Sequence, residues 1–246
     1  MSKNVKSKRS KFPKDQPEFV YAVRWIGSAI PQHSPNPETG EMFTTRISVS
    51  GTGFFLKNKP FIITCYHVVS DFVGQEDKIS EGLLHGEEEN KSKVLLVGSP
   101  FGCTPASVVA ADIKHDIAIL ETHLPEELRK EESKNGFQIG KYFPKIGERV
   151  AYCGYPLGDA LCGETHHPTY AEGAIGSVPR LSKEINRIQI SGPIVGGYSG
   201  SPVFSRYHQN TFLGMVYQTA PDVRAGQAGI FYGVGYEHIE HLARCY

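Results

Sequence analysis

The sequence lacks an excess of charge of either sign, and this balance excludes one mode of binding. Lysine and arginine together number 26, and so do aspartate and glutamate, which gives a formal net charge of zero at pH 7. The chain as a whole therefore has no field that would attract nucleic acid or an anionic membrane. A local patch exists at Met1 to Pro17, where six basic residues accompany one acidic residue. We expect residues 1–18 to form a basic, disordered tail, with a docking arm as the alternative.

Long apolar runs and paired cysteines are also missing. No stretch approaches the roughly 20 apolar residues that a membrane-spanning helix needs, and the N-terminus lacks the apolar segment of a secretory signal peptide. The cysteines contain no CxxC pair, and an odd number of scattered cysteines suits reduced thiols better than a disulfide framework. We therefore expect a cytoplasmic protein with no membrane partner. The five cysteines are Cys65, Cys103, Cys153, Cys162 and Cys245.

Short apolar runs, separated by glycine, proline and asparagine about every ten residues, make up most of the remaining sequence. That spacing is typical of all-β proteins, either a barrel or a sandwich. The expected strands are Tyr21 to Ile26, Thr45 to Leu56, Phe61 to Tyr66, Val94 to Gly98, Ala106 to Ala111, Ile117 to Thr122, Arg149 to Gly154, Ala171 to Val178, Arg187 to Ser191, Ser201 to Phe204, Phe212 to Gln218 and Phe231 to Val234.

A charged stretch without apolar alternation, His123 to Gly147, divides the strands into two sets and indicates a connection between two β-domains. The two sets could be the halves of a structural duplication. Within the stretch we expect a short helix at Pro125 to Lys134, and Phe72 to Lys93 is expected to be a long surface loop. The expected division is a β-domain over residues 19–123, a crossover over 124–147, a second β-domain over 148–235 and a C-terminal helix over 236–246.

Three segments carry residue types that work together in nucleophilic catalysis. Thr64 to Val69 places His67 at the end of an expected strand, and Asp116 leads directly into an apolar strand. Gly196 to Phe204 surrounds Ser199 with small residues. Taken singly, these segments are explained by a packed histidine, a turn aspartate and a flexible hairpin loop. A flexible loop, however, does not predict a histidine and an aspartate in matching contexts upstream.

Glycines around a reactive serine have two physical uses. They leave room for a substrate backbone and permit unusual φ angles. They also allow a tight turn to point backbone N–H groups at one spot, where the negative oxygen of a tetrahedral intermediate would be stabilised.

The strings TCYHVV, HDIAILE and GGYSGSPVF, in that order, resemble the trypsin-like serine proteases of the chymotrypsin double-barrel fold. Within that family they are closest to the bacterial high-temperature-requirement branch. The strings GTGFF from Gly51, GYPLG from Gly154 and GMV from Gly214 also resemble family motifs, so that the resemblance covers roughly Tyr21 to Leu242. It implies two antiparallel Greek-key β-barrels with the active site between them, followed by a C-terminal helix.

The resemblance also implies a role for each matched residue. Ser199 would be the nucleophile of a serine endopeptidase, His67 the general base and acid, and Asp116 the group that orients the imidazole. The backbone N–H groups of Gly197 and Ser199 would form the oxyanion hole. Neither a metal nor an organic cofactor is implied, and the expected partners are a peptide or protein substrate and a regulatory protein.

Two departures from the family pattern bear on regulation. Tyr198 stands where the digestive enzymes carry an aspartate that pairs with a newly cut N-terminus. Activation by that ion pair is therefore not expected, and the enzyme would be active as made or gated in another way. In the high-temperature-requirement branch a peptide-binding domain usually follows the protease, whereas we expect none here. Any partner is therefore expected to dock on the barrels, the basic tail or the long loop.

The residues expected around the substrate side chain carry no charge. Counting back from Ser199, the base of the specificity pocket falls at Pro193 or Ile194, neither of which could pair with a substrate lysine or arginine. Larger residues stand on the facing strand where glycines would leave an open slot. We expect a preference for uncharged side chains of small to medium size. The residues of that strand are Tyr217, Gln218 and Thr219.

Other interpretations of the same residues remain. A catalytically silent or partner-gated double barrel could bind peptides as a scaffold, and a nucleic-acid protein could use the basic tail. His238, His241 and Cys245 share one face of the expected terminal helix, which we interpret as a polar face without a metal. Cys65 is expected to be a small buried thiol.

Overall fold

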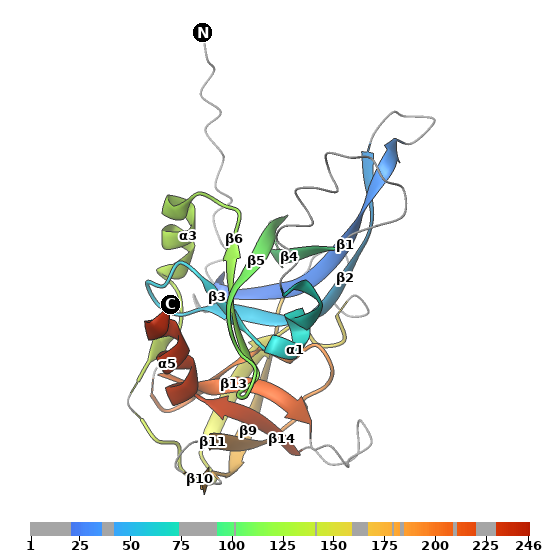
Figure 1. Cartoon of the computed structure of the whole chain (residues 1–246). Coiled ribbons are helices and arrows are strands. Elements are labelled where there is room, and N and C mark those ends of the chain that lie inside the picture. The colour runs from blue at the N-terminus through green and yellow to red at the C-terminus, as the bar shows by residue number, and fades with distance from the viewer. Residues whose placement is uncertain are drawn as a thin grey trace.

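The first barrel contains six antiparallel strands and is closed. The computed structural model describes residues 21–35, 42–73, 93–100, 102–140, 142–158, 167–178, 180–182, 185–208, 211–219 and 230–246. The order around the barrel is β1-β2-β3-β6-β5-β4 (Figure 1). Its strands are β1 (Val23–Pro35), β2 (Met42–Phe55), β3 (Ile62–Thr64), β4 (Val94–Ser99), β5 (Gly102–Asp112) and β6 (Ile117–Thr122).

The second barrel also has six antiparallel strands, and pairing between β9 and β11 closes it. Followed from its first strand, the order is β8-β9-β11-β14-β13-β12. This is the strand order of the first barrel, so both have the same Greek-key topology, in agreement with a structural duplication. The strands are β8 (Arg149–Gly154), β9 (Thr169–Ser177), β11 (Ile185–Ser191), β12 (Pro202–Ser205), β13 (Thr211–Thr219) and β14 (Ile230–Gly235).

The all-β prediction is confirmed, and each expected strand is present with shifted or identical ends. Two further strands, β7 (Gln138–Ile139) and β10 (Arg180–Ser182), were not expected, because two or three residues give no measurable alternation. One local prediction is wrong. The strand expected at Phe61 to Tyr66 ends at Thr64, and His67 lies on the short helix α1 (Tyr66–Val69).

Helices occupy little of the described chain. α1 continues into η2 (Ser70–Phe72), a single 3₁₀ turn. The two expected helices are present as α3 (Glu126–Ser133) and α5 (Tyr236–Cys245). α5 packs against β13 and β14 with Ile239 and Ala243 buried (Figure 1). No helix in the described ranges is long and apolar enough to cross a membrane. The expected N-terminal tail and most of the expected loop at Phe72 to Lys93 lie outside the described residues.

An aromatic cluster joins the two barrels. Phe137, which directly precedes β7 in the crossover, is 1% exposed and meets Phe54 of the first barrel edge to face at 5.7 Å between ring centroids. It also meets Phe204 of the second barrel at 5.5 Å, and Phe54 lies 5.0 Å from Phe212. Aromatic pairs at these separations add to the free energy gained from burial. The crossover thus contributes a side chain to the shared core of both barrels.

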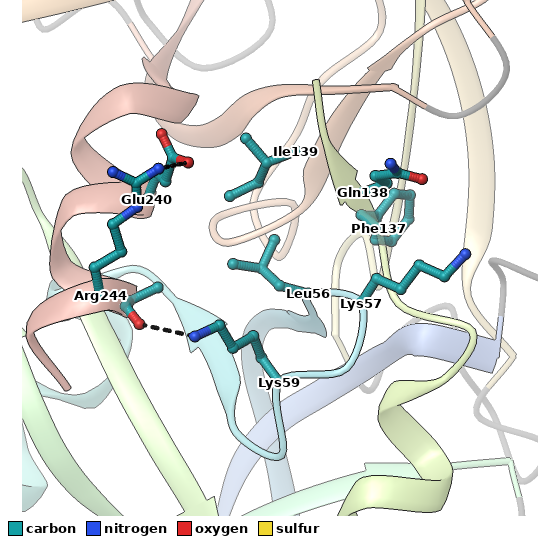
Figure 2. A pocket seen from close by; sticks show the side chains of 9 residues that line it. Leu56, Lys57, Lys59, Phe137, Gln138, Ile139, Glu240 and Arg244 are labelled. Carbon is teal, nitrogen blue, oxygen red and sulfur yellow. Dashed lines mark hydrogen bonds and ion pairs between the residues drawn. The ribbon is translucent and has the colours of Figure 1, made fainter. Parts of the chain in front are cut away.

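A cavity of about 220 Å³ lies between α5, β7 and the connection that follows β2. Leu56 and Ile139 face into it, and at its rim Lys59, Glu240 and Arg244 make polar contacts (Figure 2). Arg244 contacts Glu240 at 2.5 Å, and the Lys59 ammonium donates to a carbonyl oxygen of α5 at 3.4 Å. None of the residues predicted to act in catalysis or substrate binding lines this cavity.

Replacing Phe137 by alanine should lower the free energy of unfolding by about 3 to 5 kcal/mol, because the ring leaves a void between the barrels. Chemical denaturation monitored by circular dichroism measures this. The matched control is Tyr207→Ala, which removes a large ring that is 66% exposed and should cost little. Equal losses in both variants would contradict the assignment of Phe137 to the shared core.

Candidate active site

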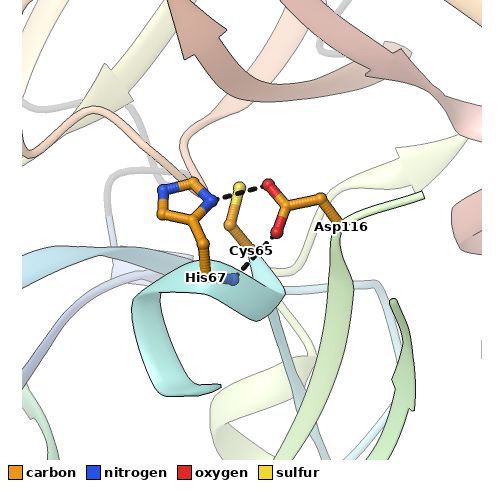
Figure 3. A group of neighbouring side chains, drawn as sticks. All are labelled: Cys65, His67 and Asp116. Carbon is orange, nitrogen blue, oxygen red and sulfur yellow. Dashed lines mark hydrogen bonds and ion pairs between the residues drawn. The ribbon is translucent and has the colours of Figure 1, made fainter. Parts of the chain in front are cut away.

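His67 and Asp116 form a directly bonded pair in the first barrel (Figure 3). Asp116 lies in the turn between β5 and β6, at a φ of 57°, a left-handed conformation that aspartate tolerates better than most residues. One carboxylate oxygen contacts the His67 Nδ1 at 2.6 Å, and the other accepts the backbone N–H of His67 at 2.8 Å. Both bonds fix the ring relative to the carboxylate. Because a carboxylate accepts, Nδ1 carries the proton, and the other ring nitrogen is left as a base.

The two residues of this pair differ in exposure. The His67 side chain is 49% exposed, whereas that of Asp116 is 19% exposed. The imidazole is therefore open to a ligand while its partner is largely covered. His67 lies on α1 rather than on a strand. The side-chain alternation of a strand therefore does not apply to it, since successive side chains of a helix point in different directions.

The loop that carries Ser199 is attached to the first barrel through Thr52 of β2. Thr52 is fully buried, and its backbone N–H donates to the Ser199 carbonyl at 2.8 Å. Its hydroxyl donates to the Gly197 carbonyl at 2.8 Å and accepts the N–H of Tyr155 at 3.0 Å. The Thr52 carbonyl accepts the hydroxyl of Thr64 at 2.7 Å. One residue of the first barrel thus positions two residues of the Ser199 loop.

Two glycines of this loop are required by its backbone. Gly197 and Gly200 have φ angles of 92° and 89°, which side chains rarely permit. A Cβ on Gly197 would lie 2.2 Å from the Tyr155 carbonyl oxygen, and one on Gly200 would lie 1.8 Å from that of Thr52. Gly196 differs, because a Cβ there would meet nothing within 4 Å. The sequence pattern around Ser199 therefore has a structural cause at these two positions.

Two backbone donors of the Ser199 loop are unused within the described structure. Neither the N–H of Gly197 nor that of Ser199 donates a hydrogen bond to a described residue. The Gly196 carbonyl accepts the N–H of Leu157 at 2.6 Å. Because the C=O and N–H of a trans peptide point in opposite directions, this bond turns the Gly197 N–H away from Leu157. The sequence motif at Gly154 to Gly158 supplies this anchor, with Leu157 at a φ of 56°.

The structure brings the Ser199 loop and the His67 segment to the same part of β2. A Cβ on Gly51 would lie 2.7 Å from Val68 and 3.1 Å from the Ser199 carbonyl oxygen. Among the described residues, however, no hydrogen bond joins the Ser199 hydroxyl to the His67 imidazole. Ser199 itself is partly exposed. Thr52 and Leu157 lie within the strings GTGFF and GYPLG, but their individual roles could not be predicted, because each acts through hydrogen bonds to a distant segment.

Cys65 lies beside the His67 and Asp116 pair, and the three ligand atoms are all within 4.8 Å of one another (Figure 3). The prediction of a buried thiol is confirmed, since Cys65 is 0% exposed. Burial, and after it the negative charge of Asp116, raises the pKa of this thiol well above its ordinary value. A metal would need the thiolate, which this environment disfavours. The donor set therefore fits a metal ion poorly.

Tyr198 is buried in the second barrel. Its side chain is 3% exposed and meets Tyr152 edge to face at 5.2 Å between ring centroids. Burial raises the pKa of Tyr198 to about 12, so the hydroxyl stays neutral. The residue before Ser199 is therefore held by packing rather than by an ion pair.

The residues expected around the substrate side chain do not share one environment. Pro193 is exposed, whereas Ile194 is 5% exposed and belongs to the core of the second barrel. Tyr217 is 8% exposed, and the Arg187 guanidinium lies 5.5 Å from its ring centroid. Gln218 and Thr219 lie on β13, and their side chains are outside the described part of the structure.

Two stacked histidines link the turn of Asp116 to α5. His115 contacts Asp112 at 2.6 Å through Nδ1 and stacks on His238 of α5 with 3.9 Å between ring centroids. Burial, and then the nearby charge of His115, lowers the pKa of His238. The other charged groups around His238 are Asp112, which opposes this shift, and Lys114 and His241, which add to it. The stack connects the terminal helix to the turn that holds Asp116.

Known proteins share this fold. A family model described as a trypsin-like peptidase domain matches residues 51–215. The Rv3671c protease of M. tuberculosis in its active form is 20% identical, with a TM-score of 0.59 over 92% of this chain and 81% of that one. The HtrA-type protease AlgW with a decapeptide is 16% identical, with a TM-score of 0.64 over 92% of this chain and 64% of that one. At these identities the two structures show the double-barrel fold.

A curated sequence relative adds little about activity. The protein y4bJ of Sinorhizobium fredii (strain NBRC 101917 / NGR234), described as uncharacterized, is 27% identical over 160 residues. The match covers 65% of this chain and 21% of y4bJ, so the chain spans about a fifth of that relative's length.

Replacing Gly197 by alanine should lower the free energy of unfolding by about 1 to 3 kcal/mol, because the new Cβ meets a carbonyl oxygen at a strained φ. Gly196→Ala is the matched control, since its Cβ enters open space. Thermal denaturation of both variants measures the difference. A Gly197 variant as stable as the Gly196 variant would show that the loop does not have this conformation.

Acid should loosen the contact between α5 and the Asp116 turn. A histidine whose pKa is lowered in the folded state stabilises the fold above its ordinary pKa of 6.5, and that contribution is lost as the pH falls through the lowered value. The free energy of unfolding should therefore drop more steeply between about pH 7 and about pH 5 in the wild type than in His238→Phe, which keeps an aromatic ring over His115 without its charge. Equal slopes in urea titrations would refute the argument.

Proposed function

The chain belongs to the trypsin-like peptidase domain family, and on that premise we propose that it is a serine endopeptidase that works through an acyl-enzyme intermediate. The observation that carries the proposal is the His67 and Asp116 pair, bonded at 2.6 Å and 2.8 Å, beside a Ser199 loop that Thr52 fastens to the same barrel. This arrangement offers a base, its orienting carboxylate and a nucleophile on neighbouring segments.

In the proposed reaction, the Ser199 hydroxyl attacks the carbonyl carbon of a peptide bond. The His67 Nε2 takes the hydroxyl proton and then passes it to the leaving amine, while Asp116 stabilises the charged imidazole. Water then attacks the acyl-enzyme, again with His67 as base, and Ser199 is released. The N–H groups of Gly197 and Ser199, which donate to no described residue, would stabilise the negative oxygen of each intermediate.

Substrate preference is proposed to favour uncharged side chains of small to medium size. Pro193, Ile194 and Tyr217 carry no charge that could pair with a substrate lysine or arginine. Tyr217 also brings a large ring to β13, which supports a shallow pocket. Gln218 and Thr219 are proposed to continue this wall along the strand.

A partner-gated enzyme, or a silent double barrel that binds peptides, is the second candidate. It is favoured by one observation, namely that no hydrogen bond joins Ser199 to His67 among the described residues. Such contacts are often long in unliganded enzymes and tighten when substrate binds. We therefore rank this candidate below the active protease, with a regulatory protein as its expected partner.

The proposed location is the cytoplasm, and the proposed substrates are proteins or peptides. Support for a reducing compartment comes from the free thiols of Cys65, Cys103, Cys153 and Cys245.

Labelling with a serine-directed fluorophosphonate tests the proposed nucleophile. The folded wild type should be labelled at Ser199, located by mass spectrometry of the modified peptide. Ser199→Ala and His67→Ala should abolish labelling, because the first lacks the nucleophile and the second the base. Ser107→Ala is the matched control, since the Ser107 hydroxyl lies 3.0 Å from His123 Nε2 but has no glycine loop around it.

Two results would count against the active enzyme. Labelling that survives Ser199→Ala would place the reactive serine elsewhere. No labelling of the folded wild type would instead favour the gated or silent barrel, and a search for a partner that restores labelling would follow.

A further inference from the structure

Cys65 is a fully buried thiol that takes no part in the proposed reaction. We propose that Cys65 is a positioning residue, whose sulfur closes the buried side of the His67 and Asp116 hydrogen bond and ties that pair to β13. The proposal deepens the proposed function, since it concerns the same pair and rests on the pair acting with Ser199.

The first observation is the shared carbonyl of Val216. The Cys65 thiol donates to this oxygen at 3.3 Å, and the backbone N–H of Gly200 donates to the same oxygen at 2.8 Å. Cys65 is two residues before His67, and Gly200 directly follows Ser199. A single acceptor on β13 therefore fixes the segment of the base and the segment of the nucleophile at one point. The N–H of Val216 donates to the Ser201 carbonyl at 2.9 Å, so both backbone groups of Val216 hold the strand to the same loop.

The second observation is the position of the sulfur relative to the carboxylate. Its distances to the ligand atoms of His67 and Asp116 are within 4.8 Å, and the residue is 0% exposed, whereas the His67 side chain is 49% exposed. The imidazole is therefore open to solvent, whereas the buried sulfur lies beside its bond to Asp116 (Figure 3). A carboxylate that water can reach exchanges its bond to the imidazole for bonds to water, which loosens the pair.

The thiol is suited to this position because it stays neutral. Burial and the charge of Asp116 raise its pKa, so it remains a weak donor rather than a second negative group beside the carboxylate. A smaller side chain would leave a space bounded by the Val216 and Asp116 oxygens. Such a space, lined by acceptors, is one that a water molecule can occupy.

The test follows the His67 Nδ1 proton by NMR in the full-length chain labelled with ¹⁵N-histidine. In Cys65→Ala, the exchange of this proton with water should become about ten-fold faster, because water reaches the bond from its buried side. Cys65→Ser should keep the exchange rate near that of the wild type, because a hydroxyl still fills the position and donates. If the alanine variant does not fold, Cys65→Val tests the tie to β13, because valine fills the space but cannot donate to Val216. Exchange should then be faster in Cys65→Val than in Cys65→Ser, and equal rates would refute the tie.

Cys153→Ala is the matched control. Cys153 is also 0% exposed, but it lies on β8 of the second barrel. Its loss should lower stability without changing the exchange of the His67 proton. If exchange in Cys65→Ala stays within about two-fold of the wild type, or if Cys153→Ala accelerates it equally, the positioning role is refuted.

The outcome is separable from that of the proposed function. The Nδ1 proton reports on the His67 and Asp116 bond whether or not Ser199 reacts with a fluorophosphonate. If the wild type is not labelled but exchange is faster in Cys65→Ala, the positioning role is supported and the active enzyme is rejected. Labelling of the wild type together with unchanged exchange would do the reverse.

Discussion

The hydrogen bonds of Thr52 are the constraint on which the candidate site depends. This residue is fully buried, and its N–H, hydroxyl and carbonyl bind Ser199, Gly197, Tyr155 and Thr64. A buried polar group is costly unless it is satisfied, so the surrounding segments have one arrangement that meets all of these bonds. Because three of the partners belong to the second barrel and Thr64 belongs to the first, satisfying Thr52 sets the position of one barrel against the other at the site.

Each barrel supplies a different part of the candidate site, and the bonds of Thr52 join the two parts. The first barrel holds the His67 and Asp116 pair, in which both oxygens of Asp116 are bonded to His67. The second barrel supplies the Ser199 loop, whose glycines approach Tyr155 and Thr52 more closely than any side chain allows. The aromatic cluster around Phe137 packs the two barrels against each other outside the site. The contacts between the barrels therefore do not depend on the site residues alone.

Much of this architecture could be predicted from the sequence, because strands and motifs are local. β6 and β8 have the predicted ends, and the segments of His67, Asp116 and Ser199 stand out by composition. What could not be predicted depends on contacts between distant residues. Thr52 and Gly197 are 145 positions apart, and nothing in the strand pattern around Thr52 distinguishes its hydroxyl as their link. α1 was missed because four residues are too few to display a helical period.

The Ser199 loop is held by packing and by backbone hydrogen bonds within the described structure. Tyr198 packs on Tyr152 inside the second barrel, where burial rather than an ion pair holds it. The loop has three further anchors, of which Thr52 and Val216 are buried and Leu157 is 52% exposed. Buried anchors can change only if the barrels themselves move, whereas the bond from Leu157 to Gly196 lies in a surface turn. Of these anchors, the Leu157 turn is therefore the one that a bound molecule can reach without unpacking the core, and its bond sets the direction of the Gly197 N–H.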